Sequence, residues 1–106
     1  MAEQRAGPVF SALADPTRRH VVEALASRET ATATELAAEL PVTRQAVAKH
    51  LSALSSAGLV EGERRGRETR YRLMPEALGE ALSWMEQVGA QWEERLAALR
   101  ARFPDR

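Results

Sequence analysis

The chain has 106 residues and no cysteine, which indicates one domain and excludes disulfides, thiolate nucleophiles and cysteine-ligated zinc or iron–sulfur sites. No apolar run reaches the roughly 20 residues that span a membrane, and the N-terminus lacks the apolar region of a signal peptide. A cytoplasmic location is therefore expected. Net charge is zero, but residues 43–72 hold seven basic against three acidic residues, while the segments on either side each hold four against six. A basic segment between acidic ones is typical of nucleic-acid contact.

Two short helices are predicted at the start of the chain. An apolar face that includes Phe10 predicts the first over residues 8–14. Asp15 then has the side chain of an N-cap, and Pro16 follows at the first helical position, where the missing N–H costs nothing. The second helix should run to about Ser27.

A pair of helices separated by a tight turn is predicted next. Thr32 and Glu35 have the spacing of a capping box and should open a short third helix, which the proline of segment 40–42 ends. Thr43 can cap a fourth helix, and Gly58 is placed to end it. The stripe that this fourth helix should bury consists of Val47, Leu51 and Leu54.

The pattern then changes to that of strands. Segments 59–65 and 67–73 alternate as strands do, with Gly66 between them, which predicts a β-hairpin with a basic tip. The earlier connector 29–33 is too short for more than a strand stub. A last helix is expected over 76–102. The fold class predicted is mostly α with a small β-hairpin, a winged helix-turn-helix in the order α-α-(β)-α-α-β-β-α.

The fourth helix and the hairpin tip together have the side chains that DNA recognition needs. An outer helix face of amides, hydroxyls and cations can reach base edges and phosphates in a major groove. The predicted DNA contacts are Thr43, Arg44, Gln45, Lys49 and His50 on the helix, and Arg64, Arg65 and Arg67 at the tip. A solvated surface is the alternative for each feature by itself. For His50, a role in bracing the helix is left open.

Apolar residues of the last helix recur at alternating spacings of four and three, as in a coiled-coil seam. They are Leu78, Leu82, Met85, Gly89, Trp92, Leu96, Leu99 and Phe103. A domain this small cannot cover so long a stripe, so a second copy is predicted to do so. The predicted dimer interface consists of Phe10, Leu78, Leu82, Met85, Trp92, Leu96 and Leu99. The alternatives are that the stripe is core within one chain, or that Trp84 and Trp92 line an effector pocket.

Several motifs resemble the ArsR/SmtB family of bacterial winged-helix repressors. They are Ala14-Asp15-Pro16-Thr17-Arg18-Arg19, Val42-Thr43-Arg44-Gln45-Ala46-Val47-Ala48-Lys49-His50-Leu51, Ala57-Gly58-Leu59-Val60 and Arg64-Arg65-Gly66-Arg67. The resemblance covers about residues 8–101. It implies a homodimer that joins through its first and last helices, here 8–14 and 76–102 of a single domain 1–106. It also implies repression at an inverted-repeat operator on double-stranded DNA, often the protein's own promoter.

The metal ligands of many such repressors have no counterpart here. The chain has no cysteine, and its last helix has no histidine. Glu76 and Glu80 would suit at most a weak oxygen site. Trp84 and the run Trp92-Glu93-Glu94-Arg95-Leu96 instead resemble a metal-blind, cysteine-free subgroup of the family. No cofactor or metal is therefore expected, and any small-molecule effector is unknown. An enzyme is not expected; the alternative function is a winged-helix protein–protein interaction module without DNA binding.

Overall fold

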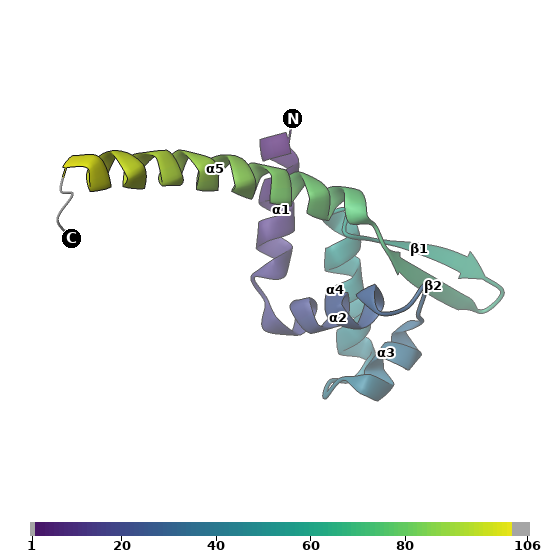
Figure 1. Ribbon diagram of the computed structural model, residues 1–106. Coiled ribbons are helices and arrows are strands. Elements are labelled where there is room, and N and C mark those ends of the chain that lie inside the picture. The colour runs from purple at the N-terminus through teal and green to yellow at the C-terminus, as the bar shows by residue number, and fades with distance from the viewer. Residues whose placement is uncertain (1, 103–106) are drawn as a thin grey trace.

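The computed structural model describes the backbone of residues 2–102 and the side chains of residues 6–102, and it shows five helices and one hairpin within that range (Figure 1). In chain order they are α1 (Ala2–Leu13), α2 (Pro16–Ala26), α3 (Ala33–Glu39), α4 (Arg44–Ser56), β1 (Val60–Arg65), β2 (Glu68–Leu73) and α5 (Pro75–Arg102). The predicted winged order is confirmed, and the strand stub is a single bridge between Ala31 and Tyr71. Phe103 of the predicted seam lies outside the described residues.

Side-chain caps begin the three helices α2, α3 and α4. The Asp15 carboxylate accepts the N–H of Arg18 at 2.9 Å and opens α2. Thr32 and Glu35 each accept the other's backbone N–H, at 3.1 and 3.0 Å, in the predicted capping box of α3. The Thr43 hydroxyl accepts the N–H three residues further on and opens α4. These caps satisfy N–H groups that a helix cannot pair internally, so local sequence sets where each helix starts.

These caps should make the stability of the fold depend on pH in acid. The Arg18 N–H holds the pKa of Asp15 below its ordinary value, and the Thr32 N–H, with Arg70 next, lowers the pKa of Glu35. Both carboxylates then stabilise the folded state above about pH 4, and this stabilisation is lost as the pH falls through their lowered folded-state pKa values.

Asn and Gln accept the same hydrogen bonds without titrating. The double variant Asp15→Asn/Glu35→Gln should therefore lose less unfolding free energy than the wild type between about pH 5 and pH 2. Urea denaturation across that range measures the difference. Equal pH slopes for the two proteins would contradict it.

A glycine ends α4 and starts the turn into the hairpin. Gly58 has φ +80°, a backbone conformation that only glycine adopts without strain, and its N–H bonds the Ser55 carbonyl at 3.0 Å. The Leu59 N–H bonds the Leu54 carbonyl at 2.9 Å, which completes a Schellman motif. Leu54 and Leu59 are both fully buried, so the same motif that ends the helix also anchors the root of β1 in the core.

The hairpin differs from the prediction at its tip. β1 and β2 pair antiparallel, with Arg65 opposite Glu68, so the turn consists of Gly66 and Arg67. The prediction that Arg67 begins the second strand, with Gly66 as the only turn residue, is wrong because the tightest common hairpin loop has two residues. Gly66 has φ +63° and comes first, as type II′ turns require. Arg67 therefore lies at the tip of the wing.

The first helix is longer than predicted. It begins at Ala2 rather than at Pro8, and it ends at Leu13. Pro8 therefore lies inside the helix, where its missing N–H removes one helical hydrogen bond. Ala6, Val9 and Ala12 lie on one face of α1 and are buried, because α1 packs against α5. This packing outweighs the local cost of the proline.

α5 packs against α1 with its first half and extends beyond the body of the molecule with its second half, on the side away from the hairpin (Figure 1). At about 1.5 Å per residue, its 28 residues span about 42 Å. No helix within residues 2–102 combines the length and apolarity needed to cross a membrane. The fold thus presents a wing at one end and a projecting helix at the other.

Candidate nucleic-acid interface

The outer face of α4 is polar and exposed, as predicted. Val47, Leu51 and Leu54 are fully buried, which fixes the rotation of the helix about its axis. The side chains on the opposite side are exposed and include Gln45 and Lys49, while Thr43 and Arg44 are exposed at the N-terminal end of the helix. The Thr43 hydroxyl is already used in the cap. The other three are therefore the groups of this face that are long enough to reach a groove of DNA.

A groove lies between the helix-turn-helix and the wing. It has a volume of about 410 Å³, and its basic lining residues are Arg44, Arg64 and Arg67. The Thr34 hydroxyl, on α3, accepts a hydrogen bond from Arg44 Nε at 3.0 Å. Arg64 Nε donates to the Gly66 carbonyl across the turn at 2.9 Å. The structure thus brings predicted residues from α4 and from the hairpin tip to the two sides of one groove.

Ion pairs separate the cations of the basic segment into two sets. Three arginines contact the three glutamates of the segment, in the pairs Arg65–Glu63 at 2.6 Å, Arg70–Glu68 at 3.5 Å and Arg72–Glu61 at 3.0 Å. Within the described residues, no carboxylate lies within ion-pair distance of Arg44, Lys49, Arg64 or Arg67. The surplus of positive charge therefore lies on the outer face of α4 and at the hairpin tip. Arg65 is held only by an exposed pair, which contributes little stability.

His50, on α4, contacts the start of α2. Its Nδ1 accepts a hydrogen bond from Arg18 Nε at 3.3 Å and lies 3.9 Å from a carboxylate oxygen of Asp15. The side chain is largely covered, with 21% of its surface exposed. These contacts describe the bracing role that the sequence left open. A DNA contact by His50 stays a prediction.

Sequence reasoning missed two residues that organise this surface, Thr34 and Arg70. Thr34 binds Arg44 ten positions away, and Arg70 binds the carboxylate of Glu35 on α3 and the hydroxyl of Thr30 in the connector. No local spacing links such distant partners. The only available signal was that Arg70 belongs to the basic segment.

The predicted seam of α5 is largely uncovered by the rest of the chain. Every residue from 89 to 102 is exposed. The exposed large apolar side chains include Leu82 and Trp92, more than half exposed at 54% and 56%, and also Phe10, Met85, Leu96 and Leu99. Leu78 is half-buried against the core. From Leu82 to Leu99 the stripe is therefore not covered by the described part of this chain, and its role in a dimer stays a prediction.

Phe10 and Trp84 form the aromatic contact between α1 and α5. Their rings meet edge to face with centroids 5.5 Å apart. Phe10 remains 36% exposed, so one side of this pair is still open to a partner. The contact ties the two helices predicted to form the dimer interface into one surface.

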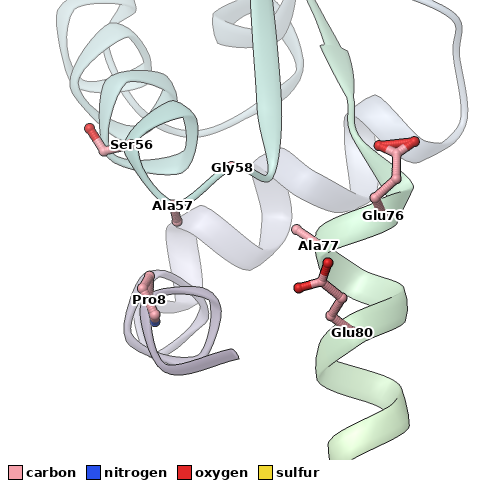
Figure 2. Close-up of a pocket in the computed structure, with 7 residues that line it drawn as sticks. All are labelled: Pro8, Ser56, Ala57, Gly58, Glu76, Ala77 and Glu80. Atoms are coloured by element: carbon pink, nitrogen blue, oxygen red, sulfur yellow. The ribbon is translucent and has the colours of Figure 1, made fainter. Parts of the chain in front are cut away.

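A cavity of about 400 Å³ lies between α1, the end of α4 and the start of α5 (Figure 2). Its lining residues are Pro8, Ser56, Ala57, Gly58, Glu76, Ala77 and Glu80. Figure 2 shows Glu80 projecting from α5 toward the gap between α1 and the end of α4. Neither Trp84 nor Trp92 lines this cavity. Across the described residues, no group of three or more histidine, aspartate or glutamate side chains is placed to hold a metal ion.

Comparisons with known proteins agree with this geometry. The family model described as "Helix-turn-helix domain" matches residues 13–63. The transcriptional repressor SdpR of Bacillus subtilis (strain 168) is 30% identical, over 73% of this chain and 84% of the relative.

Two solved structures are similar over most of the chain. The ArsR-like transcriptional regulator from Rhodococcus sp. RHA1 is 42% identical with a TM-score of 0.81, covering 93% of this chain and 92% of that one. The other is a homodimeric winged helix-turn-helix DNA-binding domain from Mycobacterium bovis, described as a possible ArsR-family regulator. It is 25% identical with a TM-score of 0.65, covering 83% of this chain and 81% of that one.

Proposed function

This chain belongs to the ArsR-like family of winged helix-turn-helix transcriptional regulators, and we propose that it is a homodimeric, sequence-specific DNA-binding repressor. The observation that carries the proposal is the set of four cations without carboxylate partners among the described residues, on the outer face of α4 and at the wing tip. We propose that it acts in the cytoplasm and binds an inverted-repeat operator, one copy of which lies in its own promoter. We also propose that it needs no metal ion and catalyses no reaction.

The two sides of the surface take different roles in this proposal. The outer face of α4 enters a major groove, where the Gln45 amide reads a base edge through two hydrogen bonds. Arg44 and Lys49 flank it, and Thr43 and His50 lie at the margins. Arg64, Arg65 and Arg67 of the wing contact the phosphate backbone, which binds DNA without reading its sequence.

These roles predict different effects for two alanine variants. Gln45→Ala should relax base preference, with a loss of about 1–3 kcal/mol at the base that it reads, and weaken binding to unrelated DNA little. Arg67→Ala should weaken binding to all sequences alike. Competition assays with operator and unrelated duplexes measure both. The assignment fails if the two variants weaken binding to operator and unrelated DNA in the same proportion.

The domain is proposed to be residues 1–106, with 8–14 and 76–102 as its dimerisation helices. The uncovered seam of α5 and the open side of Phe10 support this arrangement. The homodimeric relative from Mycobacterium bovis, whose fold this chain shares, supports it independently. The interface would be formed by Phe10, Leu78, Leu82, Met85, Trp92, Leu96 and Leu99.

A protein–protein interaction module without DNA binding is the alternative. Such a module has no need of cations gathered around a groove and left without acidic partners. The exposed amide of Gln45 beside Arg44 and Lys49 also suits base edges, which offer paired donors and acceptors. Both features favour DNA.

A gel shift with the protein's own upstream DNA tests the proposed function, with and without zinc, cadmium or arsenite. A discrete complex should form, and none of the three should release it, because the chain has no thiol and no histidine on α5. The absence of a complex would count against repression at its own promoter. Release at micromolar metal, abolished by Glu76→Gln/Glu80→Gln, would overturn the metal-independent part.

A further inference from the structure

One arginine joins the wing to the helix-turn-helix. Arg70, on β2, donates from Nε to the Thr30 hydroxyl at 2.9 Å and from a terminal nitrogen to the Glu35 carboxylate at 3.0 Å. Its other terminal nitrogen lies 3.5 Å from Glu68. The Arg70 side chain is only 24% exposed. It therefore does not offer a free cation to DNA, and its partners lie in three separate segments of the chain.

The first turn of α3 holds both sides of the groove. Thr34 binds Arg44 of α4, and the next residue, Glu35, binds Arg70 of β2. The Glu35 oxygen that binds Arg70 is also the one that accepts the Thr32 N–H in the capping box. Two adjacent residues at the start of α3, Thr34 and Glu35, therefore connect α4 to the wing, which is the β1–β2 hairpin.

The wing needs such a lateral tie. At its root, backbone hydrogen bonds of 3.0 and 2.8 Å between Ala31 and Tyr71 attach β2 to the connector. From Tyr71 to the tip at Arg67 the strand extends about 13 Å, so a rotation of about 10° at the root would move the tip by about 2 Å. A shift of that size breaks a hydrogen bond between an arginine and a phosphate.

We propose that the Glu35–Arg70 ion pair is a clamp that holds the wing at the angle at which its tip meets the DNA backbone, which makes both of them positioning residues. The inference rests on the proposed function, because it concerns how the same surface meets DNA. It assigns a task in DNA binding to two residues that do not touch DNA.

The substitution Glu35→Gln separates this role from simple electrostatics. Gln keeps the capping box, since its side-chain carbonyl accepts the Thr32 N–H, but the loss of the charge reduces the Arg70 contact from an ion pair to a neutral hydrogen bond of roughly half the strength. Removing a carboxylate beside a DNA-binding surface would by itself strengthen binding, because it removes repulsion from the phosphates. A loosened wing has the opposite effect, because its tip no longer reaches the phosphates. The direction of the change in affinity therefore tells the two apart.

A matched control exists on the wing itself. Glu63→Gln removes the same charge from an exposed glutamate that lies opposite Arg70 in the hairpin but whose carboxylate pairs with Arg65 and, among the described residues, forms no ion pair with Arg70. It should bind DNA as tightly as the wild type or more tightly. Thr30→Val is a second clamp variant, which removes the acceptor of Arg70 Nε and leaves the capping box intact.

The experiment measures Kd for an operator duplex by fluorescence anisotropy at several salt concentrations. Glu35→Gln and Thr30→Val should bind more weakly than the wild type. The slope of log affinity against log salt should become shallower by about 0.9 for each phosphate that the wing no longer neutralises, up to about 1.8 when both wings of a dimer each release one phosphate. A fold that was merely less stable would leave that slope unchanged.

A double variant completes the test. Arg67→Ala should cost less affinity in the Glu35→Gln background than in the wild type, because the misplaced tip already fails to bind its phosphate. Additive effects of the two substitutions, or a Glu35→Gln variant that binds as Glu63→Gln does, would overturn the clamp. A wild type without salt-dependent DNA binding would instead overturn the proposed function.

Discussion

Affinity for DNA should fall by about 10³–10⁵-fold between about 50 and 200 mM salt. Each copy places four cations without carboxylate partners among the described residues on the outer face of α4 and at the wing tip, so a dimer offers eight. Each phosphate that they neutralise releases condensed counterions, and this release is less favourable in concentrated salt. Eight neutralised phosphates lie within the range of about six to ten that produces a loss of affinity of this size.

Anisotropy titrations at a series of salt concentrations measure the effect. Arg67→Ala should make the slope shallower by about 1.8 per dimer, because each of two copies then neutralises one phosphate fewer. Glu94→Gln, on the exposed far part of α5, is the control and should leave the slope unchanged. A flat response of the wild type over this range would contradict the phosphate contacts.

Truncating the seam of α5 should weaken DNA binding without removing any side chain that touches DNA. Leu96→Ala or Trp92→Ala leaves a cavity in the proposed interface and should cost about 2–5 kcal/mol of dimer stability for each copy that carries it. Because both copies carry the change, the effect on assembly is doubled. Folding is proposed to be coupled to association, so the variants should also unfold at lower denaturant concentrations than the wild type.

The control for this prediction is Glu94→Ala, which lies two residues from Leu96 and hence on the opposite side of the helix. It should leave the dimer intact. Sedimentation of the wild type, Leu96→Ala and Glu94→Ala at micromolar concentration gives the fraction of dimer. If Leu96→Ala associates as strongly as the wild type, the seam is not the interface.

Local signals in the sequence predict most of the fold. Asp15, Thr32 and Thr43 predict the starts of three helices, because each side chain can accept a backbone N–H of the first turn. Gly58 predicts the end of α4, because it adopts a positive φ that favours glycine. Such signals depend on residues three or four apart, so they can be recognised from the chain alone. The Ala2 start of α1 could not be predicted in this way because packing against α5 keeps Pro8 helical, and packing between distant elements leaves no local pattern.

The candidate site is predicted less completely. The exposed face of α4 follows from the buried stripe opposite it, and the basic tip follows from the charge of the hairpin. The groove between them does not, because Thr34 meets Arg44 only once α3 packs against α4, and Glu35 meets Arg70 only once the hairpin has folded back to the start of α3. Likewise, nothing in the sequence indicates that Arg18 meets His50, 32 positions away.

Two copies of this chain are expected to bind one operator through their α4 helices. A two-fold axis through paired α5 helices would place the two recognition helices about 34–36 Å apart, in successive major grooves. Sedimentation of the wild type with an operator duplex, at micromolar concentration, measures this most directly. The expected result is a dimer when free and two copies per inverted repeat when bound. A free monomer that binds as one copy per site would contradict both the dimer and the inverted repeat.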